Sequence, residues 1–205
     1  MCLTAAMAAP PQITCTNLSG KFALNKSLSD DVDAMLELQG ITWAVRKVIG
    51  LASVVLTIKE YTKDATTHID VTTVVAGLDK TQEDRILNWQ DGEHVDKIFG
   101  KCRHRSRLVK ASDYHLEGPG SAEDAAFLKG ENLKDGRTDS RFEVDEIVQS
   151  WVESTGDAGW KCEQIWGFET INAERRYTRR VIIWNGGKVV RTRIVYDYKG
   201  EGKRG

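Results

Sequence analysis

Two pairs of histidine and aspartate stand two residues apart on segments that alternate like β-strands. His94 and Asp96 form one pair, and His68 and Asp70 form the other. Residues two apart on a strand point to the same face, so each pair places an imidazole beside a carboxylate. Such a couple can act as general acid and base, because the carboxylate favours the protonated imidazole. We take His94 and Asp96 as candidate catalytic residues; the alternative for either pair is a solvated position on an outer strand face.

A second set of candidates is aromatic or carries an amide, and much of it lies on two segments expected to pair as strands. Gln164, Trp166 and Phe168 share one face of the first segment, and Gln149 and Trp151 share one face of the second. Apolar walls with a few polar anchors are typical of a ligand cavity, although the same residues could fill a solid core. The candidate ligand-binding residues are Trp89, Gln149, Trp151, Gln164, Trp166, Phe168, Tyr177, Arg193 and Tyr196.

Arginines recur on the last two predicted strands, at Arg175, Arg176, Arg179, Arg180, Arg191 and Arg193. Alternation divides them between the two faces, so that one or two could point inward and bind a ligand oxygen in a bidentate manner. We expect most of them on the outer face, opposite acidic residues. His104 stands among Arg103, Arg105 and Arg107, and positive neighbours would favour its neutral form.

Composition and motifs exclude several classes of function. The chain has 205 residues and a formal net charge of −1, which argues against a nucleic-acid partner. It contains no P-loop, dinucleotide-binding glycine motif, HExxH or GxSxG sequence, and no spacing typical of a metal site. We therefore expect no cofactor and no metal. The functions that remain are binding of a small molecule and catalysis by a shaped pocket without a cofactor.

Cysteine usage and the first residues favour a cytoplasmic protein. The four cysteines, at positions 2, 15, 102 and 162, are scattered, and free thiols are expected in a reducing compartment. A Cys102–Cys162 disulfide is the alternative. Residues 1–16 are expected to form a disordered tail rather than a cleaved signal, because no basic region precedes the apolar run. No segment approaches the ~18 apolar residues of a membrane span.

The elements that would position these residues begin with a helix pair. Ser27 or Ser29 could cap a first helix that ends at Gly40, and Thr42 could cap a second that ends at Gly50. Neither helix is long enough to be stable alone, so both must lie against an apolar surface. They follow a short strand at about residues 21–24.

From Ser53 onward the apolar pattern has a period of two, which predicts nine further strands divided by turns. Consecutive short strands with tight turns favour an antiparallel meander, and closing it removes exposed edges. The sequence thus predicts an all-β fold, a ten-stranded antiparallel up-and-down β-barrel over residues 17–199, with a two-helix lid after the first strand. A barrel of this size leaves an interior cavity.

A polar segment at about residues 111–143 interrupts the strands and contains one short predicted helix. A loop of this length is either disordered or functional, and we leave open whether it folds over a mouth of the barrel. Residues 200–205 are expected to form a C-terminal tail.

The order of elements and three motifs resemble the intracellular lipid-binding proteins, the fatty-acid- and retinoid-binding members of the calycin superfamily. The motifs are a Gly-x-Phe-x-Leu strand from Gly20, an acidic helix from Asp33 to Gly40, and Ala44-Val45-Arg46-Lys47 in the second helix. The match is tight from Ser19 to Tyr61. Over nearly its whole length the chain also resembles a group of fungal proteins that share its LQGI and QIWGFE runs.

Two departures from the lipid-binding pattern limit what the resemblance implies. The segment at 111–143 is foreign to that family. The family also ends with an Arg-x-Tyr pair that grips a carboxylate, whereas Arg193 and Tyr196 are three residues apart and point to opposite faces. The resemblance implies a barrel that binds a small molecule, without implying a fatty acid.

Three functions follow from these observations. The leading one is a protein that binds a hydrophobic or amphipathic small molecule, such as a lipid, terpenoid or polyketide, inside its barrel. The alternative, implied by similar barrels in fungal natural-product pathways, is a cofactor-free enzyme: a pericyclase or Diels–Alderase, an isomerase, or a dehydratase. A third is an interaction module that uses the 111–143 segment. The oligomeric state is left open.

Overall fold

The structure is a computed structural model that describes residues 8–78, 80–137 and 141–201, without the side chain of Asp96. The strands are β1 (Gly20–Leu24), β2 (Val54–Lys63), β3 (Thr66–Val75), β4 (Thr81–Ile86), β5 (Gly92–Asp96), β6 (Gly100–Lys110), β7 (Glu146–Ser154), β8 (Lys161–Ile171), β9 (Glu174–Asn185) and β10 (Lys188–Tyr198). The helices are α1 (Asp33–Leu38), α2 (Trp43–Leu51) and α3 (Ala122–Leu128), with a 3-10 turn at Ala111–Asp113.

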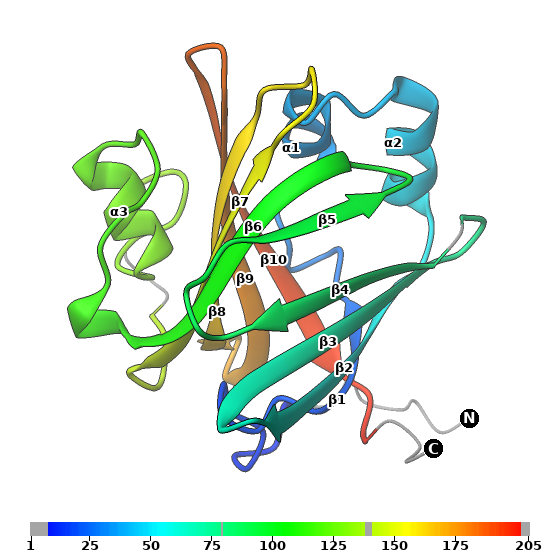
Figure 1. The fold of residues 1–205 in the computed structure, drawn as a ribbon. Helices are drawn as coiled ribbons and strands as arrows, with labels where there is room; N and C mark the ends of the chain where they lie inside the picture. Colours follow the sequence, from blue (N-terminus) through cyan, green and yellow to red (C-terminus); the bar gives the residue numbers. More distant parts are fainter. Residues whose placement is uncertain (1–7, 79, 138–140, 202–205) are drawn as a thin grey trace.

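The ten strands form one antiparallel sheet in the order β4-β3-β2-β1-β10-β9-β8-β7-β6-β5. Because the first strand joins the last, the sheet curls into a nearly closed barrel whose two edges are β4 and β5 (Figure 1). This confirms the predicted fold. β4 ends at Ile86, before Trp89, and the chain turns back after Asp96, at the end of β5.

The helix pair lies across one end of the barrel, which we call the helix end (Figure 1). Met35 on α1 is buried, whereas no residue of α2 is. The expected caps are absent, since the Thr42 side chain makes no capping bond and the Ser29 hydroxyl accepts from the Val195 amide instead. Gly50 lies within α2. The helices are therefore fixed by contacts with the barrel rather than by their caps.

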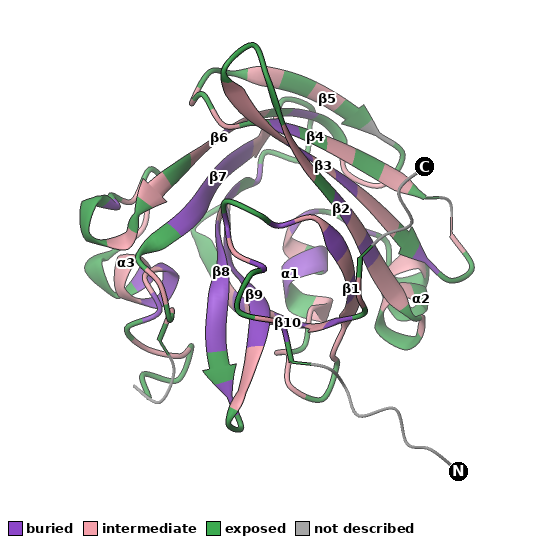
Figure 2. Ribbon diagram, turned by 90° about the horizontal axis from the view of Figure 1, so that it is seen from below, coloured by how far each residue is buried: buried purple, intermediate pink, exposed green. Residues whose placement is uncertain are grey.

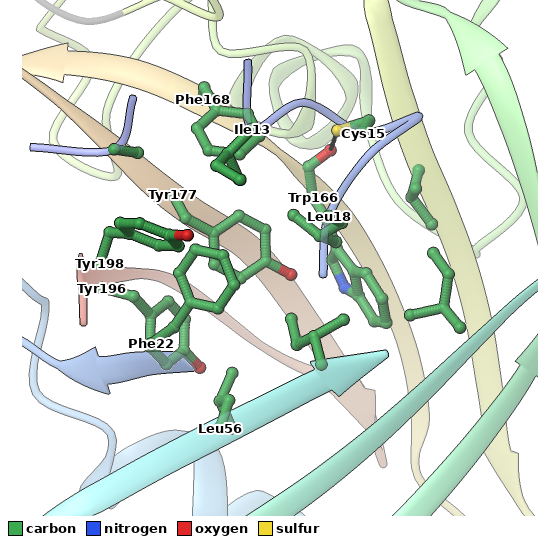
Figure 3. Packing of buried hydrophobic residues seen from close by; sticks show 14 of the residues in the cluster. Ile13, Cys15, Leu18, Phe22, Leu56, Trp166, Phe168, Tyr177, Tyr196 and Tyr198 are labelled. Atoms are coloured by element: carbon green, nitrogen blue, oxygen red, sulfur yellow. Dashed lines mark hydrogen bonds between the residues drawn. The ribbon is translucent and has the colours of Figure 1, made fainter. Parts of the chain in front are cut away.

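Residues 8–18 close the opposite end of the barrel (Figure 1). Ile13, Cys15 and Leu18 are almost fully buried and pack against rings that include Trp166 and Tyr177 (Figure 3). For residues 8–16 the expectation of a disordered tail is therefore wrong, because these apolar side chains have a core to bury into. Residues 1–7 and 202–205 lie outside the described part of the chain.

The segment at 111–143 covers the outer face of β7–β10 and not a mouth of the barrel, as α3 shows in Figure 1. Its main attachment is the buried carboxylate of Glu163. That carboxylate accepts from the Tyr114 hydroxyl at 2.8 Å, from the Gln149 amide at 2.8 Å, and from the backbone N–H groups of Glu117 and Gly118 at 3.0 Å. Both faces of β8 and β9 are consequently buried (Figure 2).

Two further expectations can be compared with the structure. Cys15, Cys102 and Cys162 are buried free thiols, so Cys102 and Cys162 are not joined in a disulfide. Cys2 lies outside the described residues. None of the described helices has the length and hydropathy needed to cross a membrane.

Candidate functional site

A cavity of about 130 Å³ lies in the helix end of the barrel, beneath α1. Its walls are largely apolar, contributed by Met35, Phe99, Val152, Trp160, Val181, Ile183 and Ile194. Its polar groups are Gln39, Glu83, Arg85, His94, His104, Gln164, Arg179 and Tyr196, with the exposed Asp84 at its border. We call this space the inner cavity. It joins a few charged groups to an apolar surround, as small-molecule sites do.

Strand alternation explains why charged side chains point into the barrel. On β4, Glu83 and Arg85 are paired with Val71 and Ile69 of β3, both of which are fully buried core residues. Paired residues of neighbouring strands lie on the same face of the sheet, so the two charged side chains also face inward. On β9, Arg179 takes the inward place between Tyr177 and Val181.

Arg179 is held rigidly at the floor of the inner cavity. Its guanidinium lies 4.0 Å from the centre of the Trp166 ring, and its Nε donates to the Tyr177 hydroxyl at 3.0 Å. Trp166 is itself fixed, because its indole N–H donates to Gln164 at 3.0 Å. Only 6% of Arg179 is exposed. A planar cation stacked on an indole in this way presents its remaining donors in a fixed direction.

Arg85 and Glu83 form an ion pair on the opposite wall, where Nη2 donates to Oε2 at 2.7 Å. Burial alone would raise the pKa of Glu83, but the guanidinium groups of Arg85 and Arg179 outweigh it and hold this pKa below its usual range. Glu83 is therefore a carboxylate at neutral pH. Arg85 is 6% exposed.

Two histidines complete the polar wall. Burial, followed by the positive charge of Arg85, lowers the pKa of His104 from 6.5 to about 4, so this imidazole is neutral. The neutral form agrees with the sequence prediction, but Arg103 and Arg105, the neighbours on which that prediction rested, point to the other face of β6. His94 also faces the inner cavity.

A larger outer cavity of about 580 Å³ opens beside the inner one. It lies between the α1–α2 connection, the β3–β4 turn and the end of β5, and it is lined by residues that include Ile41, Val45, Leu78, Val95 and Ile98. His94 lines both cavities, which places it where they meet. The two cavities together have the volume of a typical ligand site, whereas the inner one alone holds a group about the size of benzene.

Only some of the predicted site residues meet at the inner cavity. His94, Gln164 and Tyr196 line it, and Trp166 packs against Arg179. The side chain of Asp96 is outside the described part, so the His94–Asp96 couple stays a prediction. His68 and Asp70 lie away from the cavity, with His68 stacked on the Tyr61 ring and Asp70 accepting from the Tyr61 hydroxyl.

Phe168 and Tyr177 point inward but belong to the solid core at the other end of the barrel (Figure 3). Ring contacts link Tyr177 to Phe22, Phe168 and Tyr196, and the segment at residues 8–18 fills the remaining space. The predicted cavity is therefore confined to the helix end.

The other four predicted ligand-binding residues lie on the outer face, so their placement corrects the prediction. Gln149 bonds to Arg107, Glu163 and the His115 carbonyl, and Trp151 packs beneath the 111–143 segment. Trp89 lies under the Arg107 guanidinium, 4.1 Å from its ring centre. Arg193 donates to Glu169 at 3.3 Å.

The inward-facing residues missed by the prediction are Glu83, Arg85, His104 and Arg179. In the β4 sequence TQEDRI every position but the last is polar, so alternation does not reveal which face turns inward. The signal that could have found them is strand pairing. The buried residues of β3 face the barrel interior, and Glu83 and Arg85 are paired with two of them, so these side chains face the interior as well.

No protein-family model matches the chain. Among solved structures, lipid binding protein 8 of Caenorhabditis elegans has a TM-score of 0.56 at 10% identity, covering 92% of this chain and 99% of that one. A fatty-acid-binding protein from the brain of Drosophila melanogaster has a TM-score of 0.51 at 13% identity, covering 86% and 95%. At such low identity these similarities establish the fold, as the sequence resemblance implied.

Two curated fungal proteins align over almost the whole chain. Pericyclase pydY of an Acremonium species is 27% identical over 197 residues, 95% of this chain and 98% of its own length. Probable pericyclase scpY of Mollisia scopiformis is 31% identical over 196 residues, 94% of this chain and 95% of its own length. The chain therefore belongs to the family of fungal barrel proteins that contains these two pericyclases.

Proposed function

We propose that this protein is a pericyclase that needs no cofactor and encloses a hydrophobic substrate in its barrel. The observation that carries the proposal is the convergence of Glu83, Arg85 and Arg179 on one cavity with apolar walls. A carrier needs a single anchor for a head group, whereas several converging charged groups suit a site that stabilises charge developing during a reaction. The similarity to two pericyclases supports the same class of reaction.

A pericyclic reaction redistributes electrons around a ring of atoms within the substrate, so the protein supplies neither electrons nor a transferable group. Its task is to confine a flexible chain to the reactive conformation, which removes an entropic barrier. Hydrogen bonds to a carbonyl conjugated with the reacting double bonds would lower the barrier further. We assign that donor role to Arg179, which Trp166 and Tyr177 hold in place.

The dimensions of the site indicate the kind of substrate. The inner cavity is too small for a polyketide or terpenoid, so such a molecule would occupy the outer cavity as well and pass His94. His94 is positioned to assist an accompanying proton transfer, with Asp96 as its predicted partner. A cytoplasmic location, where such a substrate would be made, remains a prediction from the sequence.

The test uses the conservation of mass in a cyclisation. Purified protein is incubated with a metabolite extract of a source strain that lacks the gene, and the products are followed by liquid chromatography with mass spectrometry. We expect one metabolite to be replaced by an isomer of identical mass with a different retention time. Binding of an extract component without conversion would contradict the enzyme and favour a carrier. Heat-denatured protein is the control.

A further inference from the structure

Arg85 and Arg179 present more hydrogen-bond donors to the inner cavity than the described residues satisfy. The Nε and Nη1 of Arg85 and the Nη2 of Arg179 are buried and have no acceptor in the described part of the chain. Among the described residues, Arg85 has one hydrogen-bond acceptor, Glu83, and Arg179 has one, the Tyr177 hydroxyl. Buried charged donors are costly to leave without acceptors, which points to a ligand that supplies them.

The charge of the inner cavity has the same implication. Among the described residues, two guanidinium groups face one inward carboxylate, that of Glu83, and His104 is neutral. Asp84 borders the space from the exposed side of β4, where it accepts from Gln82 at 3.0 Å. An excess of positive charge surrounded by apolar walls favours an anionic group over a neutral one.

We propose that the inner cavity binds a pair of oxygens that share one negative charge, held between Arg85 and Arg179. A carboxylate and the enolate of a 1,3-dicarbonyl both have this chemistry. Guanidinium groups recognise such a planar pair through parallel N–H donors, which a neutral ester or ether cannot match. The proposal rests on the proposed function, because it names the polar end of the same substrate.

This assignment gives the substrate a direction in the barrel. The oxygens would lie in the inner cavity, which has room for a group of that size, and the hydrocarbon part would pass His94 into the outer cavity. The residues differ from the Arg-x-Tyr pair on the last strand of lipid-binding proteins. Here one arginine comes from β4 and the other from β9, while Arg193 faces outward to Glu169. Anion binding would thus use other strands of a similar barrel.

Equilibrium binding of probes that do not react tests the proposal. The first set is an octadecatetraenoic acid with four conjugated double bonds, whose fluorescence reports binding, with its methyl ester and its alcohol. The second set is a 2-acylcyclohexane-1,3-dione of similar chain length and its O-methyl enol ether. We expect at least one anion to bind about 30-fold or more tightly than its neutral partner. The set that shows the preference distinguishes a carboxylate from an enolate.

The variants are Arg85→Gln and Arg179→Gln, with Arg103→Gln as the matched control. Arg103 is exposed on the outer face of β6, where it pairs with Glu153. We expect each inward variant to remove most of the preference for the anion and to leave binding of the neutral partner unchanged. The control variant should behave as the unmodified protein does. Equal affinity for anion and neutral partner in the unmodified protein would overturn the proposal while leaving the proposed function intact.

A measurement on the unmodified protein guards against misfolded variants. The ultraviolet absorption of the dione shows its ionised fraction, so its pKa can be titrated free and bound. We expect the bound dione to ionise at least about 1 pH unit below its value in buffer. An unchanged or higher value would contradict the enolate form of the proposal. Failure of every probe to bind, neutral ones included, would contradict the proposed function itself.

Discussion

Arg179 and Arg180 are neighbours on β9, are both almost fully buried, and face opposite sides of the sheet. Arg180 points outward beneath the 111–143 segment, where Nε and Nη2 each donate to Glu169 at 2.9 Å and Nη1 donates to the carbonyls of Phe127 and Asn132. Arg179 points inward, donates to the Tyr177 hydroxyl, and leaves Nη2 without an acceptor among the described residues.

The difference separates a structural cation from a ligand-binding one. Every bond of Arg180 goes to another part of the fold, so this side chain attaches the insertion to the barrel. Arg179 is stacked on Trp166 but has only one hydrogen-bond acceptor among the described residues, and its unused donor faces a cavity. Burial and charge alone therefore do not identify a site; the number of donors left without acceptors does.

The largest effect should come from breaking the outer arrangement. Arg180→Met removes two donors from the buried Glu169 carboxylate, which keeps those of Arg193 and Thr178, and it also takes the donor from the carbonyls of Phe127 and Asn132. We expect a loss of about 3–5 kcal/mol in the free energy of unfolding. Urea unfolding followed by tryptophan fluorescence measures this loss. The matched change is Arg179→Met, which removes one hydrogen bond and the stacking on Trp166 but also relieves the burial of a charge, so it should cost no more than about 1–2 kcal/mol. Equal losses of stability in the two variants would contradict the distinction between a structural Arg180 and a ligand-binding Arg179.

The order of the two variants should reverse when turnover is measured. If Arg179 donates to the substrate in the transition state, Arg179→Met lowers kcat/KM by about 100-fold, as loss of a single such donor does in other enzymes. The measurement is the steady-state rate at which the substrate is converted into its isomer of identical mass. Arg103→Met, an exposed arginine on the outer face, is the control and should retain the original rate. A fully active Arg179→Met protein would exclude this residue from the chemistry.

The inner face should also be distinguishable by its response to pH. The folded pKa of His104, about 4, lies below the ordinary 6.5, so the contribution of this residue to stability is complete above pH 6.5. As the pH falls from 6.5 towards 4 the unfolded chain binds the proton first, and this contribution is lost. We expect unfolding free energy to fall by roughly 2 kcal/mol more in the unmodified protein than in His104→Gln between pH 7 and pH 4. Parallel pH profiles of the two proteins would contradict this expectation.

The sequence predicts the barrel well because alternation and turn residues are local signals. All ten strands and the helix pair are present in the predicted order. The same signals do not show which face of β7 and β9 points into the barrel. The 111–143 segment covers the outer face, so the residues of both faces are buried. Gln149 and Trp151 therefore match a cavity wall in sequence but pack against Glu163 and Trp184 outside the barrel.

The position of the cavity could not be predicted for a related reason. Residues 8–18 occupy one end of the barrel, and this short segment has no helical or strand periodicity to show that its Ile13 and Leu18 have a core to enter. Glu83 and Arg85 could be recognised as inward only after β4 is registered against β3. Long-range pairing, which local patterns do not encode, decided both points.

The smallest effect is expected on the outer face, at Trp89. This ring is stacked by Arg105 and Arg107 at 4.8 and 4.1 Å and has no contact with the inner cavity in the described structure. Trp89→Leu should change ligand affinity and turnover by no more than about 2-fold, since substitutions away from a site shift free energies by only a few tenths of a kcal/mol. Isothermal titration calorimetry with the anionic probe that binds the unmodified protein measures the affinity.

Gln164→Leu is the matched variant on the inner face. It removes the acceptor that fixes the Trp166 indole, on which Arg179 is stacked, so the guanidinium should lose its fixed direction. We therefore expect a clear loss of anion affinity in this variant and none in Trp89→Leu, although both positions resemble ligand-binding residues in the sequence. Loss of affinity at Trp89 instead would place the ligand on the outer face and would contradict the assignment of function to the cavity.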